Sequence, residues 1–142
     1  MQLHKQDKDR KALAEELVGL ALFGSVDRKA VDALAGSGRV VHLPSGWALM
    51  SEGTPADSCY VLLDGDTEVR HGADVIAELH VGALVGEAAL VDHKRRNATV
   101  VAASDVRALR LGYDDLAPLF AQHASLEQAF RAEWDKKVTS VA

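Results

Sequence analysis

The fold is decided between residues 59 and 79, which read CYVLLDGDTEVRHGADVIAEL. This stretch holds three short runs rich in apolar and β-branched residues, separated by glycine-bearing turns: 59–63, 67–70 and 75–79. Short strands at regular spacing with turn signals between them are typical of an all-β barrel or sandwich, whereas a parallel α/β fold would need helices between the strands. The stretch therefore predicts consecutive antiparallel strands.

Similar runs lie on both sides of this stretch, at 40–43, 48–50, 99–102 and 106–111. They extend the β region to residues 39–111. One interruption breaks the pattern, because residues 82–97 combine a short helix-like segment with the basic run Lys94-Arg95-Arg96. We expect a single helical turn and a basic loop at that place.

Helical spacing of apolar residues appears outside the β region. A first helix is expected from Leu13 onward after a charged lead-in, and a second short helix, N-capped by Ser25, is expected to end at Gly36-Ser37-Gly38. Two more helices are expected at 114–122 and 125–138, the last with Ser125 and Gln128 spaced as a capping box.

The predicted fold class is α+β and mainly β. It is an antiparallel, jelly-roll-like β-roll flanked by N-terminal helices and two C-terminal helices. Its parts are a helical segment at 1–38, the roll at 39–111 and the C-terminal helices at 112–142, all within one single domain, since 142 residues is the length of one domain.

Composition excludes several classes of protein. The net charge of −5 argues against a nucleic-acid-binding surface, and no apolar run approaches the ~20 residues of a membrane-spanning helix. The chain has one cysteine, Cys59, and its charged N-terminus has no signal-peptide core. We therefore expect a cytoplasmic protein without direct nucleic-acid or membrane contact.

Chemistry is concentrated between residues 82 and 100. A short helix that begins with glycine and alanine exposes backbone N–H groups to an anion, and Arg96 can add a charge-assisted, bidentate pair to the same anion. Glu87 is a poor neighbour for a phosphate, but it can accept a hydrogen bond from a sugar hydroxyl. Phosphate and sugar together indicate a nucleotide ligand.

These segments resemble the phosphate-binding cassette of the cyclic nucleotide-binding domain family. Residues 86–90, GEAAL, and 96–100, RNATV, match its two halves, and residues 52–65, EGTPADSCYVLLDG, look like its β-roll signature. The resemblance covers roughly residues 22–138. It implies a regulatory sensor domain that binds cAMP or cGMP and couples occupancy to movement of the C-terminal helix.

Ligand-binding roles follow from this resemblance residue by residue. Arg96 is expected to pair with the cyclic phosphate, and Glu87 is expected to accept from the ribose 2′-hydroxyl. Backbone N–H groups around Ala88 and Ala89 complete the phosphate site, and Gly86 keeps the approach open. Asn97 and Ala98 complete the expected set; Asn97 lacks the hydroxyl that often accompanies cGMP use, which favours cAMP.

Several alternatives stay open. Phe130 and Trp134 lie on the apolar face of the last helix, and they are either core residues or a lid over the purine base.

The chain is expected to be a receptor and not an enzyme. A cupin-type metalloenzyme is disfavoured because no His-x-His pair occurs, so no metal is expected. A degenerate roll that binds a protein, or the sensor part of a transcription factor whose output domain is missing, fits the same pattern. The effector and homodimerisation are left undetermined.

Overall fold

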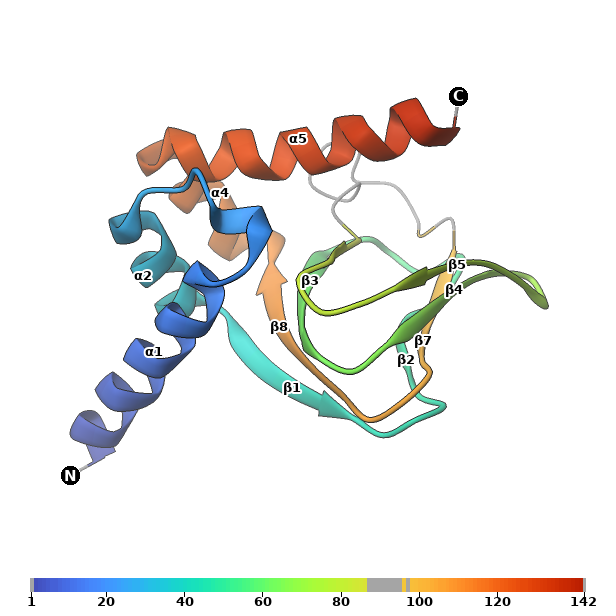
Figure 1. The fold of residues 1–142 in the computed structure, drawn as a ribbon, viewed down its shortest axis with the longest axis horizontal. Coiled ribbons are helices and arrows are strands. Elements are labelled where there is room, and N and C mark those ends of the chain that lie inside the picture. Colours follow the sequence, from blue (N-terminus) through green and yellow to red (C-terminus); the bar gives the residue numbers. More distant parts are fainter. Residues whose placement is uncertain (1, 87–95, 97, 142) are drawn as a thin grey trace. The chain divides into compact units, whose positions relative to one another are not determined.

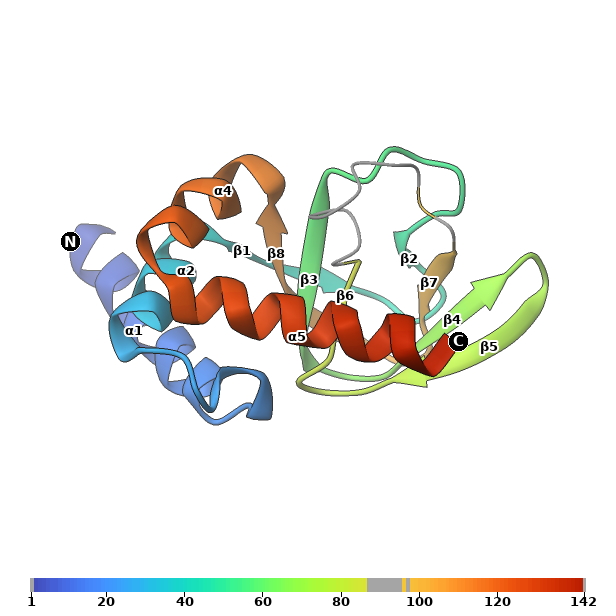
Figure 2. The same ribbon diagram turned by 90° about the horizontal axis from the view of Figure 1, so that it is seen from above.

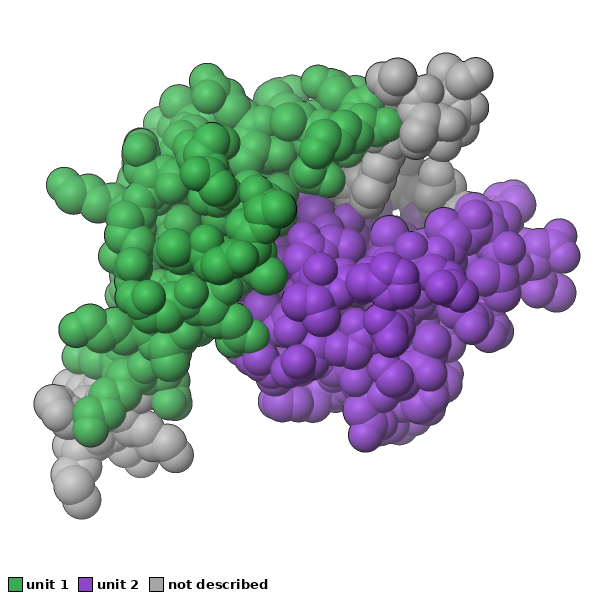
Figure 3. Space-filling view, viewed as in Figure 1, with its two compact units in different colours: residues 1–38, 114–142 green, residues 39–113 purple. Residues whose placement is uncertain are grey.

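The computed structural model describes residues 2–86, 96 and 98–141, and its elements are drawn in Figure 1. The chain divides into two compact units, which Figure 3 colours separately. One unit consists of Met1–Gly38 and Asp114–Ala142, and the other is Arg39–Tyr113. The first unit is helical and the second is built of strands.

The β unit is a roll of two four-stranded antiparallel sheets. The strand orders are β1-β8-β3-β6 and β2-β7-β4-β5. Their bounds are β1 Arg39–Leu43, β2 Ala48–Met50, β3 Ser58–Asp64, β4 Thr67–His71, β5 Asp74–Leu79, β6 Leu84–Val85, β7 Thr99–Ala102 and β8 Val106–Gly112. The predicted mainly β, antiparallel class is confirmed.

The core of the roll takes side chains from both sheets. Tyr60, Leu62 and Ala108 from one sheet belong to the same buried cluster as Leu49 and Val100 from the other. Alternate residues of a strand point to one face, and Tyr60 and Leu62 of β3 and Val106 and Ala108 of β8 reach this cluster in that way. The registers Tyr60↔Arg110 and Leu62↔Ala108 align these side chains across the pair.

The helical unit is assembled from both parts of the chain. Its helices are α1 Gln2–Val18, the 3₁₀ turn η1 Ala21–Phe23, α2 Arg28–Ser37, α4 Tyr113–Gln122 and α5 Ala124–Val141. Figure 2 shows α5 as one continuous helix. Its buried residues Leu126 and Phe130 are four apart, on one helix face, and the Phe130 ring lies edge-on to Phe120 with 5.3 Å between centroids.

Two local predictions were wrong, one strand was missed and one prediction is not covered by the described residues. α1 begins at Gln2, so the charged segment before Leu13 is helical rather than a lead-in. α2 is N-capped by Asp27, not Ser25, although it ends at Ser37, within the predicted Gly36-Ser37-Gly38 stop. β6, a two-residue strand, was not predicted. The predicted helical turn within 82–97 falls largely on residues 87–95 and 97, outside the described residues.

Ser125 also has another role than the predicted capping box. It lies inside α5, which begins at Ala124, and its hydroxyl accepts a hydrogen bond from the backbone N–H of Asp27 at 3.1 Å. Asp27 is the residue that precedes α2, so Ser125 connects the start of that helix to α5. The hydroxyl of a residue near a helix start can accept from any backbone N–H that lies close in space. Here that donor is 98 residues away in sequence.

None of the helices in the described part of the chain is long and apolar enough to span a membrane.

Candidate functional site

Arg96 has its backbone fixed by the loop that follows β2. Its N–H donates to the carbonyl of Thr54 at 2.8 Å, and its own carbonyl accepts from the N–H of Gly53 at 2.9 Å. Two successive residues thus face one residue, and the first of them is a glycine with a φ of +84°, as in a β-bulge. The position of the Arg96 backbone is therefore set by residues more than forty positions earlier in the chain.

The guanidinium of Arg96 is buried, with 7% of the residue exposed. Its Nη2 donates to the carbonyl of Ser58 at 2.5 Å and lies 3.5 Å from the Ser58 hydroxyl, while Nη1 donates to the carbonyl of Gly86 at 3.2 Å. Among the described residues its acceptors are all neutral oxygens. Because burying a charge is costly without a counter-charge, such a guanidinium is well suited to bind an anion.

Gly86 makes room for this guanidinium. Its φ of +82° lies in the left-handed region that glycine adopts readily. A Cβ built on Gly86 would lie 2.6 Å from Arg96 Nη1 and 3.3 Å from the sulfur of Met50. Both the backbone conformation and the close approach therefore require glycine at this position.

Ser58 is a site residue that the sequence analysis missed. It is the first residue of β3 and is 2% exposed, and it holds Arg96 through its carbonyl and hydroxyl. The family-like segment 52–65 contains it, yet a serine at a strand start gives no sign of such a role. The one available signal was a hydroxyl directly before five apolar residues of a buried strand.

The predicted ligand-binding residues are only partly covered by the structure. Gly86 and Arg96 are brought together, and Ala98 is buried two residues further along. Glu87, Ala88, Ala89 and Asn97 lie outside the described residues. For these four, the assigned roles stay predictions.

The two aromatic residues offered as a base lid differ in exposure. Phe130 is 2% exposed and packs against Phe120 inside the helical unit, the contact that a core role predicts. Trp134, four residues along α5, is half-buried. A lid role stays a prediction for both.

The histidines and the cysteine do not form a metal site within the described residues, where no group of three potential ligands comes together. His71 lies 3.3 Å from Glu52, and His80 lies 2.7 Å from Asp66. The hydrogen bond to Asp66 raises the pKa of His80 above its ordinary value. Cys59 is fully buried, as expected for a structural thiol.

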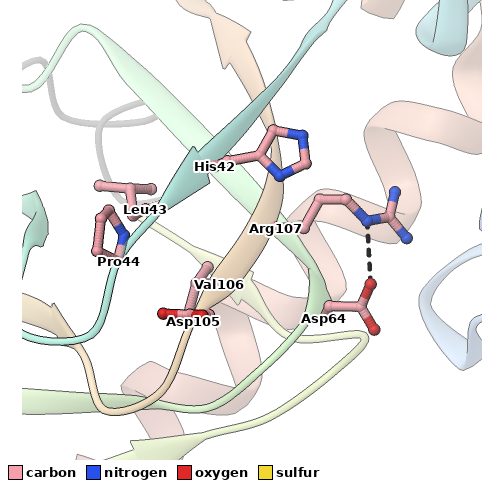
Figure 4. A pocket seen from close by; sticks show the side chains of 7 residues that line it. All are labelled: His42, Leu43, Pro44, Asp64, Asp105, Val106 and Arg107. Carbon is pink, nitrogen blue, oxygen red and sulfur yellow. Dashed lines mark hydrogen bonds and ion pairs between the residues drawn. The ribbon is translucent and has the colours of Figure 1, made fainter.

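A pocket of about 560 Å³ lies elsewhere on the β unit, where β1 and β3 end and β8 begins (Figure 4). Arg107 and Asp64 form a 3.0 Å ion pair within it. The residues that line it are His42, Leu43, Pro44, Asp64, Asp105, Val106 and Arg107. It includes none of the predicted ligand-binding residues.

The sequence of this chain is similar to parts of longer known proteins. A cAMP-dependent protein kinase regulatory subunit from Aspergillus fumigatus is 33% identical over 89% of this chain, which covers 30% of that protein. The acetyltransferase Pat from Mycolicibacterium smegmatis is 31% identical over 66% of the chain, which covers 29% of it. The chain thus spans about a third of the length of these curated relatives.

Solved structures agree on the fold. A structure described as Sp-2Cl-cAMPS bound to PKAR CBD2 matches with a TM-score of 0.82 at 21% identity, covering 94% of this chain and 90% of that one. The sequence pattern described as the cyclic nucleotide-binding domain matches residues 40–123, which is more than half of the chain. With a buried arginine on a β-roll and this pattern across most of its length, the chain belongs to the cyclic nucleotide-binding domain family.

Proposed function

We propose that this chain is a sensor domain that binds a cyclic nucleotide, with Arg96 pairing with the cyclic phosphate. The observation that carries this proposal is the buried Arg96 guanidinium, held by Ser58 and Gly86. A guanidinium fixed in advance loses little freedom when it binds phosphate, and its planar fork suits two phosphate oxygens. Glu87 then accepts from the ribose 2′-hydroxyl, and backbone N–H groups around Ala88 and Ala89 complete the phosphate site.

The proposed ligand is cAMP in preference to cGMP. Two considerations support it: position 97 is asparagine rather than a hydroxyl residue, and relatives of this chain are named for cAMP. The protein acts as a receptor module rather than an enzyme, even though one relative is an acetyltransferase. Its location is the cytoplasm, and its effector is a partner protein or an output domain.

Occupancy is converted into movement of α5. This helix is held in its own unit by Leu126 and Phe130, which are buried, whereas Trp134 toward its end is only half-buried. A helix held by one apolar face can exchange docking positions at modest cost. The ligand must then bind the two arrangements with different affinity, since equal affinity would shift neither population.

Titration calorimetry with cAMP and cGMP tests the proposal, on protein first checked for co-purified nucleotide. The matched variants are Arg96→Ala and Arg95→Ala, which each remove one positive charge from adjacent positions. Removing one partner of a buried, hydrogen-bonded charge pair costs about 3–5 kcal/mol, so Arg96→Ala should weaken binding at least about 100-fold. Arg95→Ala should leave the affinity within a few fold.

Two results would contradict this assignment. Equal impairment of both variants, or unchanged binding by Arg96→Ala, would mean that Arg96 is not the phosphate ligand. No binding of either nucleotide by nucleotide-free wild type would favour the alternative of a degenerate roll that recognises a protein.

A further inference from the structure

A short loop between β2 and β3, residues 51–54, has several contacts with the segment around Arg96. Gly53 and Thr54 exchange two backbone hydrogen bonds with Arg96. The backbone N–H of Glu52 donates to the hydroxyl of Thr99, at the start of β7, at 2.9 Å. The loop therefore fixes the chain on both sides of position 97.

The side chain of Glu52 connects this loop to the turn between β4 and β5. Its Oε1 accepts a hydrogen bond from the backbone N–H of Gly72 at 3.3 Å and lies 3.3 Å from Nδ1 of His71. Gly72 has a φ of +60°, so its N–H direction is set by a left-handed turn. One carboxylate oxygen thus joins the tip of the β4–β5 hairpin to the loop that holds Arg96.

We infer that Glu52 is a positioning residue for the phosphate site: by tying the 51–54 loop to the hairpin tip at Gly72, it fixes the backbone of Arg96. The effect of Glu52 on ligand affinity rests on the proposed function. Its effect on the Arg96 backbone rests on the described contacts alone. All the residues involved belong to the β unit.

The hydrogen bond to Gly72 carries more of this role than the ion pair with His71. The His71 and Glu52 side chains are 65% and 43% exposed, and exposed ion pairs contribute little because water screens them. The bond to the Gly72 N–H instead joins the 51–54 loop directly to the backbone at the tip of the hairpin. Losing a hydrogen bond of about 0.5–1.5 kcal/mol corresponds to about 2- to 12-fold in an equilibrium constant.

The test uses three variants of the intact chain. Glu52→Ala removes the acceptor, and Glu52→Gln keeps an acceptor oxygen for Gly72 while removing the charge. Asp74→Asn is the matched control, because it removes a carboxylate from the same hairpin, opposite His71 in the strand register. Two quantities are measured on each: hydrogen exchange of the Arg96 amide in the nucleotide-free protein, and the Kd for cAMP.

The expected result is graded. Glu52→Ala should speed exchange of the Arg96 amide about 2- to 12-fold and raise the Kd by a similar factor. Glu52→Gln and Asp74→Asn should stay within twofold of wild type in both measurements. Because exchange at the Arg96 amide needs no ligand, the positioning role is tested even if wild type binds no nucleotide, in which case only the proposed function fails.

Three results would overturn the inference. Unchanged exchange at Arg96 in Glu52→Ala would show that the loop holds its position without this side chain. An equal effect of Asp74→Asn would assign the change to general electrostatics. An equal effect of Glu52→Gln would show that the hydrogen bond to Gly72 is not the means.

Discussion

Replacing Gly86 by alanine isolates the role of the close approach to Arg96. The added Cβ would lie 2.6 Å from Nη1, and ordinary contact begins at 3.4 Å, so the guanidinium must move away from its present position. The Cβ would also lie 3.3 Å from the sulfur of Met50, which is closer than ordinary contact. The substitution therefore disturbs Arg96, the proposed phosphate-binding residue, without removing it.

The expected effect of Gly86→Ala has two separable parts, one on folding free energy and one on ligand affinity. A non-glycine residue at a left-handed φ costs about 1–2 kcal/mol of folding free energy. Displacing the guanidinium costs affinity in addition, and losing one hydrogen bond to a charged group, at about 1.5–3 kcal/mol, weakens binding about 10- to 150-fold. Stability and affinity should thus both fall, for different reasons.

Gly46→Ala is the control for the first part. Gly46 has a φ of +93°, and a Cβ there would meet nothing within 4 Å. Urea unfolding should show a similar backbone penalty in both variants, while calorimetry with cAMP should show weakened binding in Gly86→Ala alone. If Gly86→Ala bound cAMP as tightly as Gly46→Ala, the contact with Arg96 would not matter for the ligand.

Three further predictions concern other parts of the chain. In a Trp47→Phe variant, the emission maximum of Trp134 or its quenching by iodide should change at saturating cAMP. If this signal stayed unchanged and deletion of residues 125–142 did not weaken binding, Phe130 and Trp134 would not form a lid over the base. Asn97→Thr should move the cAMP-to-cGMP affinity ratio toward cGMP in competition binding; a wild type that already prefers cGMP would contradict the basis of this prediction. The pKa of His80 is raised by its hydrogen bond to Asp66, so it should fall in Asp66→Asn in an NMR titration. Because the pKa of His80 is higher in the folded protein than in the unfolded chain, the stabilisation by this pair is complete below about pH 6.5. It is lost as pH rises through the pKa of the folded protein.

The strands of the roll could be predicted because their signals are local. β2 and β7 were placed at their observed bounds, and β1, β3, β4, β5 and β8 within one residue at each end. Alternating apolar residues and glycine turns define such strands without reference to the rest of the chain. β6 has two residues and pairs with Tyr60 and Val61 only in the folded roll, so no local pattern marks it.

Caps and contacts across the chain could not be predicted in the same way. The hydroxyl of Ser125 has a partner 98 residues away at Asp27, and spacing within one helix says nothing about such a partner. The same limit applies to the site. Arg96 and Gly86 stood out through motif and chemistry, but Ser58 and the 51–54 loop reach Arg96 through backbone carbonyls and N–H groups, which every residue type carries.

The helical unit is formed by two chain segments that are joined through the whole β unit, Arg39–Tyr113. Closing a flexible loop of about 75 residues costs on the order of 4 kcal/mol of chain entropy. A folded roll removes much of this cost, because β1 and β8 pair with Arg39 opposite Arg110 and so hold the two ends of the segment close together. A ligand that stabilises the roll should therefore slow the opening of the Asp27–Ser125 bond without touching either residue.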